Sequence, residues 1–174
     1  MMFFALAALT AAATGAGAAS DPLAPAIAGL LECTRPDDQK KTCLSLASYR
    51  LVEGSTYSIT SAILISPSGP LILETVSPAI LKPGSVCGVM KPEDLSSGRI
   101  RVAGKLLSHA QAAPILARMA TALSGMMNKE VCVSYERSGE GGVVTKTVID
   151  GLYQADQDQV VEWVQPDAGY VVAP

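Results

Sequence analysis

Apolar and polar side chains alternate along several short stretches of the chain, which is the pattern of half-buried β-strands. In the run YSITSAILI at 57–65, the tyrosine and isoleucines share one face, with Ser61 as the one exception. Similar runs at 43–52 and 71–76 lie on either side of it, each separated from it by a short turn-forming stretch. This arrangement predicts an antiparallel meander of three strands.

The second half of the chain contains further runs of strand character. They lie at 85–90, 99–106, 130–137, 143–150 and 159–164. The glycine-rich stretch 138–142 separates two of these runs, which is the clearest hairpin signal in the chain.

One long stretch has helical periodicity instead. Residues 111–127 place apolar side chains three and four positions apart, and Arg118 is their only charge. Pro114 is expected in the first turn, because a proline deeper in a helix removes a backbone hydrogen bond. A helix that is apolar over most of its circumference is normally buried, so we expect this one to be buried. A short helix is also indicated at 21–32.

These elements predict an α+β fold, with a largely antiparallel, curved sheet of about 6–8 short strands. The main helix, at about 111–127, would cover the apolar face of the sheet. Short connections argue against parallel βαβ units. A small, OB-like, partly closed barrel with the helix at one end is the alternative. The alternation pattern does not distinguish the curved sheet from the barrel, because both architectures bury one face of each strand.

The first 20 residues differ from the rest of the chain. They carry no charged side chain, and a short apolar core gives way to alanine, glycine and serine. This pattern predicts a cleaved signal peptide at 1–20 and a single disulfide-stapled domain at 21–174. A retained membrane anchor is the alternative, but residues 11–20 are only weakly apolar. We therefore expect a periplasmic or secreted protein with no membrane span in the mature chain.

Four cysteines lie beyond this leader: Cys33, Cys43, Cys87 and Cys132. An even number in an exported chain favours two disulfides. Among the three possible connectivities we favour Cys33–Cys43, which closes a short polar loop, and Cys87–Cys132, which joins two apolar strand-like runs. The spacing matches no zinc motif and no C-x-x-C redox motif, so we expect neither a metal nor a cofactor.

Composition and motifs exclude several function classes. The net charge is −3 and no basic patch is interleaved with aromatic residues, which argues against nucleic-acid binding. A single histidine excludes any site that needs two. The nucleophile elbow and the common phosphate-binding loops are also absent. The first hypothesis is therefore a small non-catalytic binding protein of the cell envelope, which presents an exposed apolar or aromatic patch to a protein or envelope partner.

Two other functions remain as alternatives. A small envelope hydrolase would use His109 as a base or a pair of carboxylates. His109 lies between a strand and the main helix, where a polar residue at the helix entry is the simpler interpretation. A carrier of an apolar ligand, held in a cavity between sheet and helix, is suggested by the methionines of the 111–127 helix.

Overall fold

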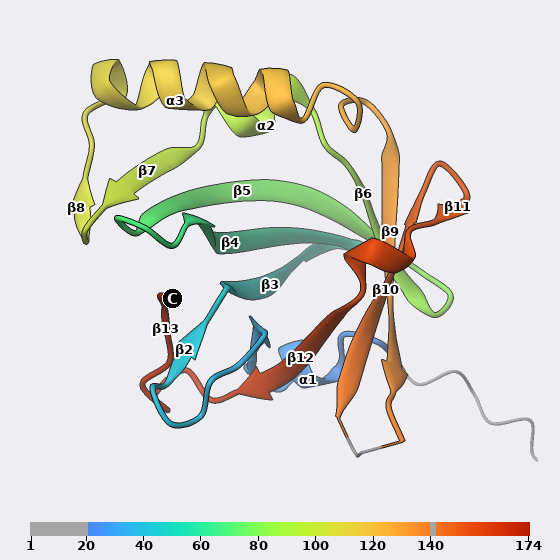
Figure 1. The fold of residues 1–174 in the computed structure, drawn as a ribbon. Helices are drawn as coiled ribbons and strands as arrows, with labels where there is room; N and C mark the ends of the chain where they lie inside the picture. The colour runs from blue at the N-terminus through green and yellow to red at the C-terminus, as the bar shows by residue number, and fades with distance from the viewer. Residues whose placement is uncertain (1–20, 140–141) are drawn as a thin grey trace, which may run out of the picture.

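The computed structural model describes residues 21–139 and 142–174, and its centre is a closed antiparallel barrel of eight strands (Figure 1). The strands are β1 (Leu31–Thr34), β3 (Ser45–Glu53), β4 (Thr56–Ser66), β5 (Leu71–Lys82), β6 (Ser85–Val89), β9 (Glu130–Arg137), β10 (Val143–Ile149) and β12 (Gln159–Val164). Their order around the barrel is β4-β3-β1-β12-β10-β9-β6-β5, and β5 closes it by pairing with β4. The expected α+β class is confirmed, and the sheet takes the barrel form. The expected signal peptide at 1–20 lies outside the described residues.

The remaining elements surround this barrel. Strands β7 (Arg99–Val102) and β8 (Lys105–Leu106) continue from β5, and β11 (Leu152–Tyr153) pairs with β10. Strands β2 (Thr42–Cys43) and β13 (Val171–Val172) form a separate parallel pair. The helices are α1 (Ala24–Ile27), α2 (Pro92–Ser96) and α3 (His109–Ala122), with a 3₁₀ turn, η1, at Ala155–Gln157. No helix in the described ranges is long and apolar enough to cross a membrane.

Strand β5 is longer than its apolar pattern suggests, because it continues through Pro78 to Lys82. One side of the strand pairs with β4 along its length, whereas the other pairs with β7 at 71–74 and with β6 at 80–82. The Pro78 carbonyl lies 3.1 Å from the point where a Cβ on Gly88 of β6 would stand, so it faces this second side. A proline is tolerated there because no ladder partner needs its missing N–H.

Two cores lie on the same face of β5. Ala79 packs with Leu23 and Tyr57 in the barrel core, whereas Leu73 packs with Ile100 and Leu116 beneath α3. Because odd-numbered residues of a strand share one face, the inward face of β5 continues under the helices. Figure 1 shows α3 running above β5 and β7, with α2 beside it.

The main helix differs from expectation in its bounds and in its burial. It begins at His109, where the Gln111 side chain accepts a hydrogen bond from the Ser108 backbone N–H, and it ends at Ala122. Pro114 therefore lies in the second turn, and the expectation of a first-turn proline is wrong. Only Ala112 and Leu116 are fully buried. The other alanines account for the apolar pattern, but so short a side chain does not require burial, and much of the helix faces solvent.

The predicted helix at 21–32 is shorter than expected. It spans only Ala24–Ile27, and Gly29 follows with a φ of +86°, the left-handed conformation that ends many helices. The chain then starts strand β1 at Leu31, an element that the sequence pattern did not reveal.

Two disulfide bonds are present, and their pairing is the one favoured from the sequence. Cys33–Cys43 joins β1 to β2, and Cys87–Cys132 joins β6 to β9 at directly opposed positions. The two bonds are compatible with an oxidising, exported environment.

Gly98, between α2 and β7, has no room for a side chain. A Cβ there would lie 2.9 Å from both the Leu95 carbonyl oxygen and Leu73 Cδ1. We expect Gly98→Ala to lower the free energy of unfolding by about 1–3 kcal/mol, because the backbone of α2 must shift. Urea unfolding measures this loss. Gly125→Ala is the control, since nothing lies within 4 Å of its Cβ position, and equal losses in the two variants would contradict the packing explanation.

Candidate functional site

Alternation along β4 and β5 separates an inner face from an outer face. Tyr57 and Ala79 point into the barrel core, so the even-numbered residues beside them point outward. Three successive outward positions carry hydroxyls on β4 and apolar side chains on β5. They are Thr56, Ser58 and Thr60 on β4, which oppose Ile80, Pro78 and Val76 on β5. Val76 and Ile80 leave 57% and 49% of their surface exposed, so this face is apolar and uncovered.

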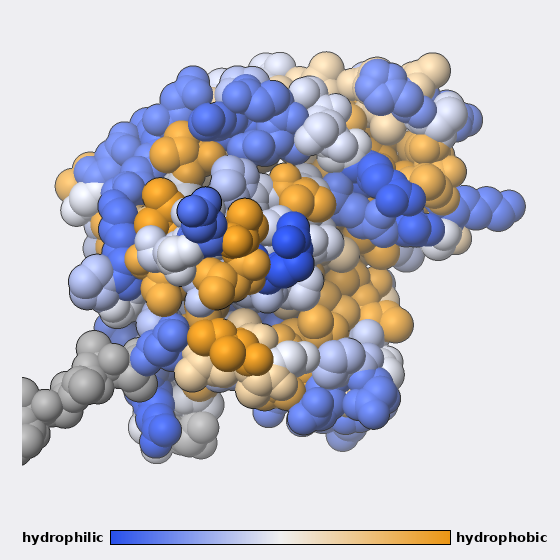
Figure 2. Space-filling view, turned by 180° about the vertical axis from the view of Figure 1, so that it is seen from behind, coloured by the Kyte–Doolittle hydropathy of each residue, from blue (hydrophilic) through white to orange (hydrophobic). Residues whose placement is uncertain are grey.

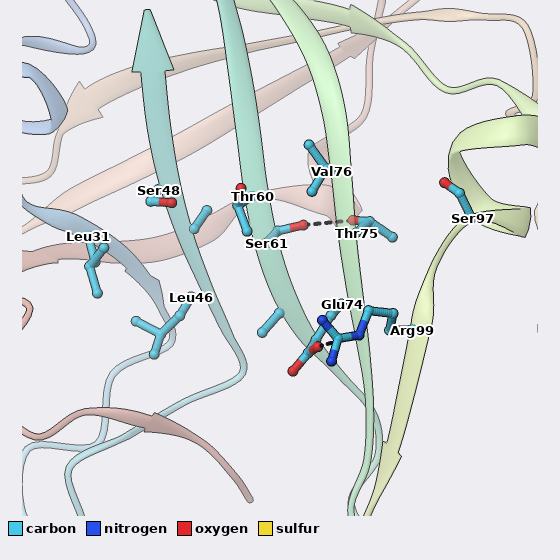
Figure 3. A pocket seen from close by; sticks show the side chains of 12 residues that line it. Leu31, Leu46, Ser48, Thr60, Ser61, Glu74, Thr75, Val76, Ser97 and Arg99 are labelled. Carbon is cyan, nitrogen blue, oxygen red and sulfur yellow. Dashed lines mark hydrogen bonds and ion pairs between the residues drawn. The ribbon is translucent and has the colours of Figure 1, made fainter. Parts of the chain in front are cut away.

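A hollow of about 620 Å³ lies on this outer face, across β1, β3, β4, β5 and β7 (Figure 3). Leu46 and Val76 give it apolar walls, and Ser48 and Thr60 contribute hydroxyls between them. Seen from behind, hydrophobic residues gather near the middle of the molecule with hydrophilic residues among them (Figure 2). The first hypothesis required an exposed apolar patch, and Val76 and Ile80 form one on the outer face of β5.

Ionic side chains mark one end of the hollow. Glu74 Oε1 lies 2.5 Å from Arg101 Nε, and Glu74 Oε2 lies 3.7 Å from Arg99 Nε. Arg99 directly opposes Glu74 in the β5–β7 ladder, and 58% of its side chain is exposed. Two guanidinium groups therefore share one carboxylate, and this end of the hollow carries an excess positive charge.

His109 lies in a different place, a hollow of about 200 Å³ between α2 and α3. Its lining consists of His109, Pro92, Ser96, Leu116 and alanines, and it includes no carboxylate. The Ser96 hydroxyl donates its hydrogen bond to the Glu93 carbonyl oxygen at 3.1 Å. The structure therefore does not assemble a base, a nucleophile and an orienting acid around His109. The outer hollow likewise contains only one carboxylate, Glu74, and neither hollow lies inside the barrel.

A second cluster of chemical interest lies within the barrel, and it was not among the sites predicted from the sequence. Tyr49 and Tyr135 both donate hydrogen bonds to Glu32 Oε2, at 2.5 and 2.7 Å. Their hydroxyl oxygens are 3.1 Å apart, and both rings pack against Trp163 with centroid separations of 6.0 and 5.7 Å. Four strands, β1, β3, β9 and β12, each contribute one residue to this cluster.

Burial determines the acid–base properties of this cluster. Loss of solvation raises the pKa of the Glu32 carboxyl, and the two tyrosine hydrogen bonds oppose this rise only in part. Burial is the largest cause of the raised pKa of both tyrosines, and the charge of Glu32 is the next largest. Both hydroxyls therefore stay protonated and act as donors. The cluster is thus a carboxyl group held by two neutral hydroxyls.

The sequence contains a weak signal for this cluster. Glu32 is a charged residue between Leu31 and Cys33, and each aromatic partner occupies an inward position of an alternating strand. The partners lie 17 and 103 residues away along the chain, so only the folded barrel shows that they meet.

One group of metal-type ligands occurs in the described part of the chain, and it consists of Cys87, Glu130 and Cys132. The two sulfur atoms are joined in a disulfide and supply no thiolate, so this group is not a metal centre. Glu130 instead accepts a 2.6 Å ion pair from Lys82.

Comparison with known proteins adds no assignment. No protein-family model matches the chain, and a search of curated proteins found no match either. Function is therefore inferred from the residues and their geometry.

Proposed function

We propose that this chain is a periplasmic or secreted binding protein that contacts a protein partner of the cell envelope, without catalysis, through the outer face of β3, β4 and β5. The single observation behind this proposal is the hollow of about 620 Å³, whose apolar lining includes the exposed Val76. Large exposed apolar surfaces on small proteins commonly mark interaction sites. The two disulfides agree with an exported location.

The shape and chemistry of the hollow support binding more than catalysis. It lies on the outer face of the sheet, and Glu74, the one carboxylate among its lining residues, is held by two arginines. A general acid or base needs a free proton-transfer group within reach of a substrate. The apolar walls and hydroxyls suit a complementary protein surface, in which apolar groups lose water and hydroxyls bond to the partner backbone.

A photocrosslinking residue placed at position 76 of the exported full-length chain tests this proposal. Val160 on β12 provides a matched control, because it is a valine on the barrel exterior with 53% exposure against 57% for Val76. We expect a discrete crosslinked species from position 76 and none from position 160. Equal crosslinking from both positions would contradict the proposal.

An arginine at the same position is expected to disrupt the contact. Val76→Arg would place an unpaired charge in the centre of the interface, and a central residue of this kind contributes about 2 kcal/mol, or about 30-fold in Kd. The readout is affinity for the partner captured at position 76, with thermal unfolding to show that the variant is folded. Val160→Arg should bind like the unmodified protein, and a Val76→Arg variant that also binds normally would overturn the assignment.

A further inference from the structure

The outer face of the barrel carries positive charge at two separated points, although the whole chain has a net charge of −3. The first point is the Glu74 end of the hollow, where Arg99 and Arg101 share one carboxylate. The second is Arg50 on β3, which is exposed and has no ion-pair partner among residues 21–139 and 142–174. Glu53 is exposed on the same face, where it opposes Thr56 one outward position beyond Ser58, so it lies outside the span between the two points.

Strand pairing places these two points on the same face. Arg50 opposes Ser58, which opposes Pro78, whereas Arg99 opposes Glu74. The two arginines are therefore four residues apart along the strand direction and three strands apart across the sheet. With about 3.3 Å per residue and about 4.8 Å per strand, the separation is about 20 Å.

The surface between the two points is apolar and hydroxyl-bearing. The line from Arg50 to Arg99 crosses the row formed by Ser48, Thr60 and Val76, which belongs to the hollow. A ligand that spans this line meets a cation at each end and an uncharged floor between them. An extended polypeptide covers about 20 Å with about six residues.

We propose that the hollow binds an extended segment of a partner protein that carries acidic residues about six positions apart, with small apolar or hydroxyl residues between them. This inference rests on the proposed function and gives the chemistry of the partner. The acidic groups would pair with Arg50 and with the excess charge beside Glu74, and the middle of the segment would lie on Val76 and Thr60. Complementary charge at such a rim sets specificity and association rate.

Synthetic peptides test the proposal directly. One peptide carries a glutamate at each end of a segment of about six residues with an Ala, Val and Thr centre, and its counterpart has lysine in place of both glutamates. The oxidised protein is titrated with each peptide at physiological salt, and the chemical shifts of its backbone amides report binding. We expect saturable shifts at Ser48, Thr60 and Val76 with the acidic peptide and none with the lysine peptide.

Charge-removing variants identify the residues responsible. Arg50→Gln and Arg99→Gln should each weaken binding of the acidic peptide about fivefold. Arg118→Gln, at an exposed position on α3, should leave the affinity for this peptide unchanged. Equal weakening by Arg118→Gln, or equal binding of the lysine peptide, would overturn the proposal. Heparin serves as a polyanion of a different class, and equal shifts at these residues with heparin would also overturn it, because the face would then recognise charge alone.

The outcomes separate this inference from the proposed function. If position 76 crosslinks a partner but the acidic peptide causes no shifts at the hollow, the binding face stands and the acidic-segment inference fails. If crosslinking from positions 76 and 160 is the same, the binding face itself fails, whatever the peptides show.

Discussion

Replacing Cys87 and Cys132 together with alanine should lower the free energy of unfolding by about 4 kcal/mol. The two cysteines are 45 residues apart in the sequence, so their bond removes a large loop entropy from the unfolded chain. It also holds β6 against β9, and this pairing is one of those that close the barrel. Alanine is preferred to serine because Cys87 is only 2% exposed and a hydroxyl there would be buried. Urea unfolding of the oxidised proteins at a fixed pH measures the loss.

The other disulfide provides the comparison. Cys33 and Cys43 are separated by 10 residues, so the paired alanine variant should lose about 3 kcal/mol, which is about 1 kcal/mol less. Both of these cysteines are fully buried, whereas Cys132 of the other bond is only partly buried, so packing alone would make the short-loop variant lose more. A larger loss from the short loop than from the long one would contradict the loop-entropy explanation.

Glu32→Gln should abolish a loss of stability that the natural protein shows as the pH rises. Burial raises the pKa of Glu32 in the folded state above its ordinary value, whereas in the unfolded chain the group keeps that value. Below the ordinary value both states hold the proton, and the full stability is present. Between the ordinary value and the raised value only the folded state keeps the proton, so stability falls until the pH passes the raised value.

Glutamine retains a carbonyl oxygen for the hydroxyls of Tyr49 and Tyr135 and cannot ionise. The measurement is urea unfolding of both proteins from pH 4 to pH 8, and the stability of the variant relative to the natural protein should increase with pH. Glu162→Gln is the control, because Glu162 is exposed on the neighbouring strand β12. A stability difference that stays constant over this range would show that burial does not alter the titration of Glu32.

A second substitution separates hydrogen bonding from charge. At pH 4 the folded protein holds Glu32 in its neutral form, so Glu32→Leu removes hydrogen bonds without removing a charge. The loss should be about 1–3 kcal/mol, the usual cost of buried hydroxyls without an acceptor. Equal stability of the leucine and natural proteins at pH 4 would mean that the tyrosine hydroxyls find other partners.

Local sequence patterns predicted the parts of the fold that depend on neighbouring residues. The meander of β3, β4 and β5 and the hairpin of β9 and β10 follow from alternation interrupted by short turns. Helix α2 also has local causes, since Pro92 is its first residue and the Asp94 carboxylate accepts a hydrogen bond from the Lys91 backbone N–H. The disulfide pairing followed from loop composition and strand character.

Features that depend on distant residues were not predicted. Barrel closure requires β1 to pair with β12, so Leu31 meets Val164 at the far end of the chain, and four-residue β1 has too few positions to show alternation. The predicted helix at 111–127 runs past the observed end at Ala122, because alanines and methionines count as apolar in the pattern whether or not they are buried. Glu32 and its two tyrosines come from three strands, and the outer hollow from five, so neither site leaves a contiguous motif.

The strands at the ends of the pairing order, outside the closed barrel, are very short. Among the described residues these edge strands are β8 and β11, with two residues each, and the separate β2–β13 pair is equally short. Long open edges are templates for intermolecular strand pairing and aggregation, and natural sheets limit them by shortness and charge. Lys105 supplies such a charge on β8. These two short strands therefore offer little template for strand pairing with another chain, even though the outer face of β5 exposes valine and isoleucine.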